Sequence, residues 1–259
     1  AIMAAFAVLG ALDRIFGNRV GLGPEFENGI LSLGSLALSM VGIISLAPVL
    51  AGLLRPVVVP VYRVLGADPA MFAGTILAND MGGAPLAKEL AGSPEAAKLG
   101  ATVVFTIPVA LGILDPKDRP ALAKGVLSGI VTIPVGVLVG GLVAGFPILM
   151  VLRNLIPIVL IALLIALGLW KWEGGMIRGF AVFGKIIVAI ITIGLAAALV
   201  ESLTGLVLIP GMAPISEGLS IVGDIALVLA GAFPLVWAIT KVFRKPLMKL
   251  GSLLGMNDT

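Results

Sequence analysis

The stretch LGADPAMFAGTILANDMGGAPLAKEL, residues 65–90, decides how we interpret the rest of the chain. Asp68 is a suitable N-cap and Pro69 suits a first helical turn, so a helix is predicted over residues 69–79. The apolar run stops at Asn79-Asp80, and the glycines and proline of residues 82–85 predict a break followed by a second helix. Backbone opened at membrane depth survives only where it lines a cavity or is buried in protein. We therefore predict a discontinuous helix, the alternative being a tight surface loop with Asn79 and Asp80 solvated.

Composition places the chain among polytopic membrane proteins. Of its 259 residues, 59% are hydrophobic and 12% are charged, and the mean hydropathy is +1.19. Soluble domains are about 45–50% apolar and about 25% charged. The chain contains no cysteine and no histidine, which excludes disulfides, thiolate nucleophiles and histidine-ligated metals. We expect no metal and no cofactor. The net charge of +3 does not indicate nucleic acid, because the basic residues stand at the borders of apolar segments.

The apolar segments predict an all-α protein with several membrane crossings. A truncated first helix is expected at residues 1–12, because the segment is apolar but too short to span and lacks an initiating Met. Further crossings are expected within residues 29–54, 93–114, 125–152, 154–170, 179–200 and 218–240. Connectors are expected at 56–66, 171–178 and 201–217. Placing the basic borders at 14–19, 117–124, 171–178 and 241–249 on the cytoplasmic side collects eleven lysines and arginines there, against three on the other side.

An internal repeat is predicted between residues 29–66 and 218–255. A shift of 189 positions aligns Gly29 with Gly218, Gly42 with Gly231 and Arg55 with Arg244, without gaps. On the predicted topology the two copies are inverted, the arrangement that gives transporters two-sided access to a site near the membrane midplane. We expect one transmembrane domain over residues 1–259, with the second copy incomplete.

Five residues are candidate substrate ligands: Thr75, Asn79, Asp80, Ser35 and Asp224. Asp80 is the strongest, because a carboxylate beside the carbonyl end of a broken helix suits a cation, especially an ammonium group. The amide hydrogens at the start of the next helix would receive a hydroxyl oxygen. Asp224 aligns with Ser35 in the predicted repeat, although it lies close enough to the border of its span to be interfacial.

The same residues carry a resemblance to a known family. The segments MFAGTILANDMGG (71–83), KELAG (88–92) and VFTIPVALG (104–112), with residues 37–48, resemble the ethanolamine permease of ethanolamine-utilisation operons, EutH. The likeness extends over essentially the whole chain. It implies a multi-pass protein of the bacterial inner membrane that imports ethanolamine. Family members are expected to be longer at the C-terminus and between Lys98 and Leu99.

Two other functions stay open at this point. The first is transport of another small organic cation or an amino acid by the same architecture. The second is an intramembrane aspartyl protease using Asp80 and Asp224. The protease is disfavoured because Asp224 follows Val222-Gly223 rather than a Gly-x-Gly pattern, so the chain is not expected to be an enzyme. The expected partners are ethanolamine and the lipid bilayer, with no nucleic acid, and a homo-oligomer is left open.

Overall fold

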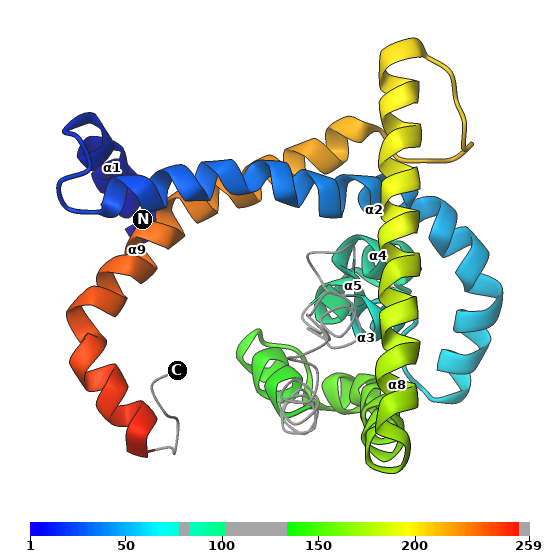
Figure 1. The fold of residues 1–259 in the computed structure, drawn as a ribbon. Coiled ribbons are helices and arrows are strands. Elements are labelled where there is room, and N and C mark those ends of the chain that lie inside the picture. Colours follow the sequence, from blue (N-terminus) through cyan, green and yellow to red (C-terminus); the bar gives the residue numbers. More distant parts are fainter. Residues whose placement is uncertain (78–82, 102–133, 254–259) are drawn as a thin grey trace. The chain divides into compact units, whose positions relative to one another are not determined.

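The computed structural model describes residues 1–77, 83–101 and 134–253. These residues form helices and loops, and no strand occurs among them. The helices are α1 (Ile2–Ile15), α2 (Leu22–Val64), α3 (Ala70–Ile76), α4 (Gly83–Leu90), α5 (Pro94–Ala101), an unlabelled helix at Pro134–Val143, α8 (Ile148–Thr204) and α9 (Ile215–Leu253) (Figure 1). The prediction of an all-α chain is confirmed for the described part.

Four segments within these residues are long and apolar enough to cross a membrane. They are Leu22–Val64, Ile148–Met176, Val182–Thr204 and Ile215–Phe243. The chain is therefore a membrane protein built from helices.

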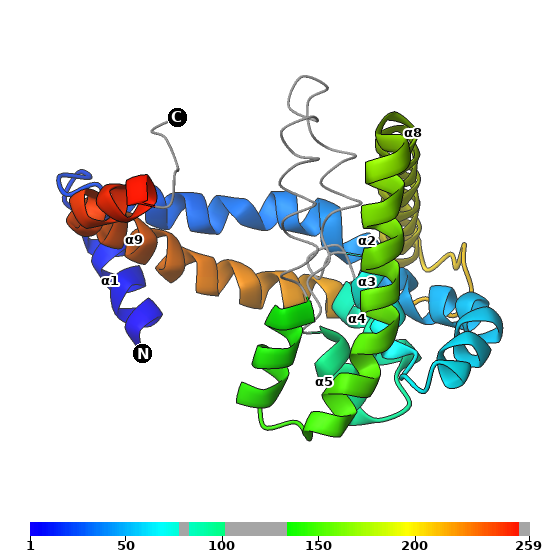
Figure 2. The same cartoon turned by 90° about the horizontal axis from the view of Figure 1, so that it is seen from below.

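The chain divides into two compact units. Unit 1 consists of residues 1–37 and 219–259, and unit 2 of residues 38–218. In unit 1, α2 and α9 run antiparallel and side by side in both views (Figures 1 and 2). A methyl group added at Gly29 would lie 2.6 Å from the Cα atom of Ala230, so the glycine permits this close packing of the two backbones.

The core of unit 2 joins the second half of α2 to α3, α4, α5 and α8. Ile43 and Tyr62 of α2, Met71 of α3, Leu99 of α5 and Ile158 of α8 are all buried in it. The short helices α3, α4 and α5 pack against one another. Each is too short to span a membrane, so the long helices around them hold them in place.

Three predicted boundaries are wrong. The connector expected at 56–66 continues α2 to Val64, since Pro56 and Pro60 lie inside the helix, and the chain turns at Gly66 with a φ of +69°. The loop expected at 171–178 is helical, although Trp172 breaks the regular geometry with a φ of −150° and a ψ of 53°. The crossing expected at 125–152 contains a turn at Gly145, between Val143 and Ile148.

Candidate functional site

The predicted interruption lies between α3 and α4. Helix α3 ends at Ile76, Leu77 is extended with a φ of −110° and a ψ of 141°, and α4 begins at Gly83. The break after α3 is confirmed, but it comes earlier than predicted, because the helix expected to run to Asn79 ends at Ile76. Asn79 and Asp80 themselves lie outside the described residues, so their role stays a prediction.

The residues flanking the interruption are buried. Thr75 and Leu77 are 1% and 4% exposed, and Gly83 is buried at the start of α4. Close packing supports this arrangement, since a methyl group at Gly100 of α5 would lie 3.0 Å from the Cβ atom of Ala70. The flanks are thus packed inside unit 2, and the alternative of solvated Asn79 and Asp80 concerns residues outside the described part of the chain.

Thr75 stands beside a second buried hydroxyl that the sequence analysis did not select. The Thr75 hydroxyl donates to the Phe72 carbonyl over 2.7 Å. Tyr62 lies next to it and packs edge-on against Phe72, with ring centroids 6.2 Å apart. The Tyr62 hydroxyl is buried beside the Thr75 side chain, but it forms no hydrogen bond of normal length and angle with a described residue. Buried polar groups normally have partners, so this hydroxyl marks a place where a water or a substrate would bind.

Ser35 and Asp224 belong to a different unit from Thr75. Both belong to unit 1 and both are exposed on their helices. Ser35 stands six residues after Gly29, and Asp224 stands six residues before Ala230. Because Gly29 meets Ala230 in an antiparallel pair, Ser35 and Asp224 lie at the same level of that pair. The Ser35 hydroxyl donates to the Ser32 carbonyl over 2.9 Å.

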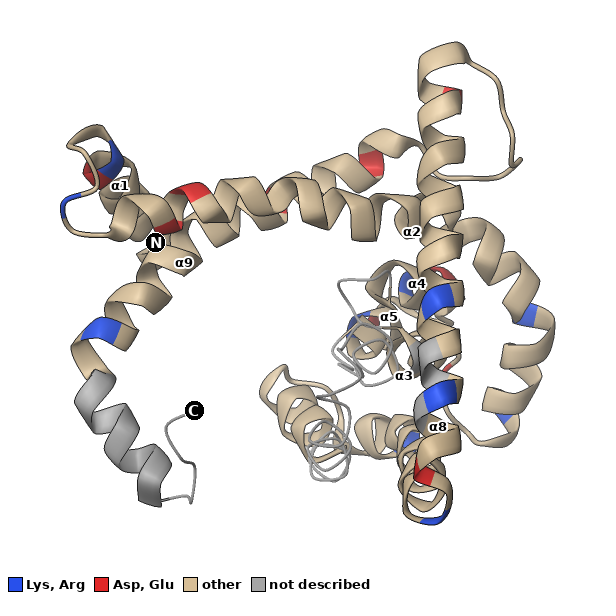
Figure 3. Cartoon of the chain, viewed as in Figure 1, with Lys and Arg blue, Asp and Glu red and all other residues tan. Residues whose placement is uncertain are grey.

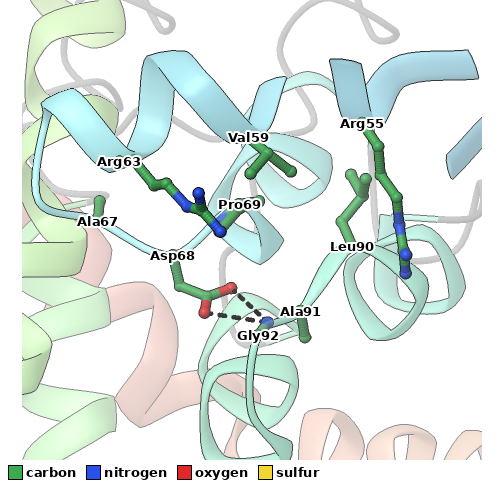
Figure 4. A pocket seen from close by; sticks show the side chains of 9 residues that line it. All are labelled: Arg55, Val59, Arg63, Ala67, Asp68, Pro69, Leu90, Ala91 and Gly92. Carbon is green, nitrogen blue, oxygen red and sulfur yellow. Dashed lines mark hydrogen bonds between the residues drawn. The ribbon is translucent and has the colours of Figure 1, made fainter. Parts of the chain in front are cut away.

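A pocket of about 510 Å³ opens where α2 ends and α3 begins (Figure 4). Its charged lining consists of Arg55, Arg63 and Asp68, and its remaining lining comes from Val59, Ala67, Pro69, Leu90, Ala91 and Gly92. Figure 3 shows that charges are sparse along the long helices. A pocket with three charged residues therefore stands out among the described residues.

Backbone hydrogen bonds fix the Asp68 side of this pocket. The Asp68 carboxylate accepts the Ala70 N–H over 2.9 Å and the Gly92 N–H over 3.1 Å. The Asp68 N–H donates to the buried Asn154 side chain over 2.7 Å, which ties this loop to α8. Asp68 thus precedes α3 as predicted and also joins α3 to the start of α5.

Comparison with known proteins gives the family. The whole chain, residues 1–259, matches the family described as "Ethanolamine utilisation protein, EutH". The chain belongs to the EutH family. It is 61% identical over 266 residues to the "Probable ethanolamine permease EutH" of Listeria monocytogenes, covering 99% of this chain and 71% of that protein. Identity is 51% over 267 residues to Bacillus subtilis "Uncharacterized protein YxeR", covering 100% of this chain and 72% of that protein.

A third relative in the EutH family adds information on length. The "Probable ethanolamine permease EutH" of Escherichia coli is 46% identical over 304 aligned positions, covering 99% of this chain and 74% of that protein. The alignment exceeds the 259 residues of the chain, so it contains positions without a counterpart here. This agrees with the expectation of additional residues in relatives, without locating them at Lys98. No solved structure matches the chain.

Membership in the EutH family does not support the protease alternative. The relatives from Listeria monocytogenes and Escherichia coli are named probable permeases. Asp224 is exposed in unit 1, which gives it none of the burial expected of a catalytic dyad in a membrane. The sequence analysis did not select Tyr62, which lies beside Thr75, or Arg63, which lines the pocket. The signal for Tyr62 was that it is the single tyrosine of the chain and stands only a few residues before the discontinuous helix.

Proposed function

We propose that this EutH protein is a permease that imports ethanolamine across the bacterial inner membrane. The observation that carries the proposal is the interruption between α3 and α4. Both helices pack inside unit 2, in a chain that also contains apolar helices long enough to cross a membrane. Discontinuous helices of this kind form the substrate sites of many transporters. The names of the Listeria and Escherichia relatives supply the substrate.

The residues at the interruption suit the two ends of ethanolamine. We assign the ammonium group to Asp80 and Asn79, because a carboxylate compensates the charge that would otherwise be costly within the membrane. We assign the substrate hydroxyl to Tyr62 and Thr75, since the Tyr62 hydroxyl lacks a partner among the described residues. A substrate with an ammonium group and a hydroxyl group would give both pairs of side chains a hydrogen-bonding partner, whereas a hydrocarbon would give a partner to neither.

An inverted repeat would give this site access from both sides, and helix ends support one. Helix α1 ends at Ile15 and the last part of α8 ends at Thr204, which is the same shift of 189 positions that aligns Gly29 with Gly218. The sequence comparison did not use these helix ends. They extend the proposed repeat to α1 and the end of α8.

Close approaches within each unit occur in matching pairs. In unit 1, Gly29 approaches Ala230, and in unit 2 Gly218 approaches Val41, where an added methyl would lie 3.1 Å from the Cα atom. Adding 189 to the number of Gly29 gives Gly218, and subtracting 189 from that of Ala230 gives Val41. The first pair therefore maps onto the second. The same operation applies to the approach of Gly231 to Met3. It gives Gly42 and residue 192, and Gly42 does approach the neighbouring residue Ile191.

This relation gives Ser35 and Asp224 a special place. They are aligned in the proposed repeat, and within unit 1 they stand at the same level of α2 and α9. We propose that Ser35 and Asp224 are further polar ligands on the substrate path, and that Asp80 belongs to the primary substrate site.

A growth experiment tests the proposed activity. The amine of ethanolamine should titrate near the lysine reference of about 10.4, so the neutral form that crosses lipid unaided falls about tenfold per unit of acidification. A strain without its own permease, grown on limiting ethanolamine, should gain most from this protein at pH 6 and least at pH 8. An advantage confined to alkaline medium would contradict a cation permease.

The alternative substrate class is separated in the same strain. Another small organic cation or an amino acid, supplied in tenfold excess, should not slow growth on ethanolamine if ethanolamine is the preferred substrate. Strong inhibition by such a compound would assign the protein to the broader class of small-cation transporters.

A further inference from the structure

The pocket at the end of α2 contains opposite charges that do not pair with each other. Arg63 and Asp68 both line it, yet no ion pair joins them within 4.0 Å. The Arg63 side chain makes no hydrogen bond or ion pair with any described residue, although its backbone carbonyl accepts the Gly66 N–H. Figure 4 shows Arg63 extending from α2 toward the Asp68 side, with Arg55 extending past Leu90 on the other side. A ligand bearing both charges would complement this lining.

The two arginines of this pocket favour a ligand that carries a phosphate group. Guanidinium groups carry five donors and bind phosphate oxygens in a bidentate manner. Arg55 donates one hydrogen bond to the Glu89 carbonyl over 2.6 Å and keeps its other donors. Arg63 keeps all of its donors for a ligand. We therefore assign the phosphate to Arg63, with Arg55 adding positive charge at the opposite wall.

Asp68 is placed to receive an amine. Its carboxylate accepts two backbone N–H groups, and a carboxylate offers about four acceptor sites, so capacity remains. Gly92 makes this geometry possible, because a methyl group there would lie 2.9 Å from an Asp68 oxygen. The carboxylate is thus held rigidly in the wall of the pocket.

An apolar stripe lies on the same part of α2. Leu53, Val57, Val61 and Val64 recur at helical spacing and are 71%, 67%, 51% and 88% exposed. In a helix that crosses the membrane, such a stripe contacts acyl chains. A charged pocket beside an acyl-binding stripe has the chemistry of a phospholipid headgroup site.

We propose that this pocket binds a phosphate ester that carries an amine, with the phosphate on Arg63 and the amine on Asp68, and that its source is a phospholipid. The stripe of Leu53, Val57, Val61 and Val64 favours the lipid over a soluble phosphate ester. The lining of this pocket includes none of the residues assigned to the substrate site, and the inference does not depend on which substrate the protein transports.

Native mass spectrometry of delipidated protein tests the site. Phosphatidylethanolamine should bind to the wild type, and Arg63→Gln should lower its occupancy about tenfold, as expected for lost charge-assisted hydrogen bonds. Arg153→Gln is the matched control, because Arg153 is an exposed arginine of α8 that does not line the pocket. Equal lipid retention by Arg63→Gln and Arg153→Gln would overturn the proposal.

A second variant keeps the test independent of charge and folding. Val59→Trp would fill the pocket and leave both arginines in place, so it should also lose the lipid. Retention of the lipid by Val59→Trp at wild-type occupancy would contradict binding in this pocket.

Competitors distinguish the sources of the ligand. Soluble phosphoethanolamine should displace the lipid only at far higher concentration, and inorganic phosphate should be weaker still. Displacement by phosphoethanolamine at equal concentration would overturn the lipid assignment. Displacement by inorganic phosphate as effective as that by phosphoethanolamine would overturn the role of Asp68.

Discussion

Asp13 shows how one residue fixes the start of a membrane-spanning helix. It is buried near the end of α1, and its carboxylate accepts the N–H groups of Val20, Gly21, Leu22 and Gly23 over 2.8–2.9 Å. The first amide hydrogens of α2 thereby receive an acceptor from another helix. Burial by itself would raise the pKa of Asp13, but the four backbone hydrogen bonds together lower it below its ordinary value of 3.8.

The lowered pKa of Asp13 predicts a pH dependence of stability. A carboxyl group whose pKa is lower in the folded state stabilises the fold above its unfolded value and loses that contribution as pH falls. The melting temperature of detergent-solubilised protein should therefore drop as the pH falls below about 3.8. Asp13→Asn should melt lower than the wild type at pH 6, and the gap should narrow near pH 3. An unchanged gap between the two proteins across that range would contradict the role of the Asp13 charge.

Asp80 is the single residue on which the main functional prediction depends. Asp80→Asn should lower ethanolamine uptake more than tenfold while the protein still inserts, because the ammonium group loses its counter-charge. Asn79→Ala should have a smaller effect, since it removes hydrogen bonding and no charge. Labelled ethanolamine uptake, normalised to the amount of protein in the membrane, measures both. Near-normal uptake by Asp80→Asn at neutral pH would contradict the assignment.

Tyr62 gives a prediction that separates stability from function. Tyr62→Phe removes a hydroxyl that has no partner among the described residues, so the free energy of unfolding should change by less than about 1 kcal/mol. If the hydroxyl binds substrate, the Michaelis constant for ethanolamine should rise several-fold. An unchanged Michaelis constant would remove Tyr62 from the site.

At the scale of elements, local signals in the sequence predicted helix starts better than helix ends. A crossing was expected to begin at residue 93, and α5 begins at Pro94, where the Ala96 N–H donates to the Ser93 hydroxyl over 3.1 Å. Asp68 likewise precedes α3 as predicted. The prolines of α2 were misleading, because a proline removes one hydrogen bond but does not end a helix whose neighbours hold it.

The interruption was predictable and its buried setting was not. Glycines, proline and the Asn-Asp pair stand next to one another in the sequence, so their effect is local. The hydrogen-bond partner of Thr75 is Phe72 in the same helix, whereas its neighbour Tyr62 comes from α2, thirteen residues earlier with a turn between them. Such tertiary neighbours cannot be read from spacing along a single helix, and for this reason the Tyr62 hydroxyl and the pocket at Arg63 were missed.

Packing of α5 on α3 predicts a matched pair of variants. Gly100→Val would force a side chain against Ala70 and should destabilise the protein by about 1–3 kcal/mol while lowering transport. Gly136→Val introduces the same residue in a helix where an added methyl meets nothing within 4 Å. Thermal unfolding in detergent and uptake should both separate the two variants. Equal behaviour would show that α5 does not support the interrupted helix.

At the scale of the whole molecule, the inverted repeat makes a prediction about sidedness. The loop after α1 and the loop after α8 correspond under the shift of 189 positions, so an inverted repeat places them on opposite faces of the membrane. Cysteines introduced at Phe16 and Val207 are suitable probes, because both side chains are exposed and the native chain contains no cysteine. A membrane-impermeant thiol reagent should label position 16 only from the cytoplasm and position 207 only from outside. Labelling of both positions from one face would rule out the inverted arrangement.

The proposed activity is tested most directly by uptake of labelled ethanolamine into proteoliposomes containing the purified protein. At pH 6 the neutral amine is scarce, so leakage through the lipid is smallest and carrier-mediated flux is clearest. The predicted result is uptake well above that of protein-free liposomes, saturable, and abolished by excess unlabelled ethanolamine but not by an amino acid such as alanine. Uptake equal to that of protein-free liposomes at pH 6, with the protein shown to be folded and inserted, would contradict the account.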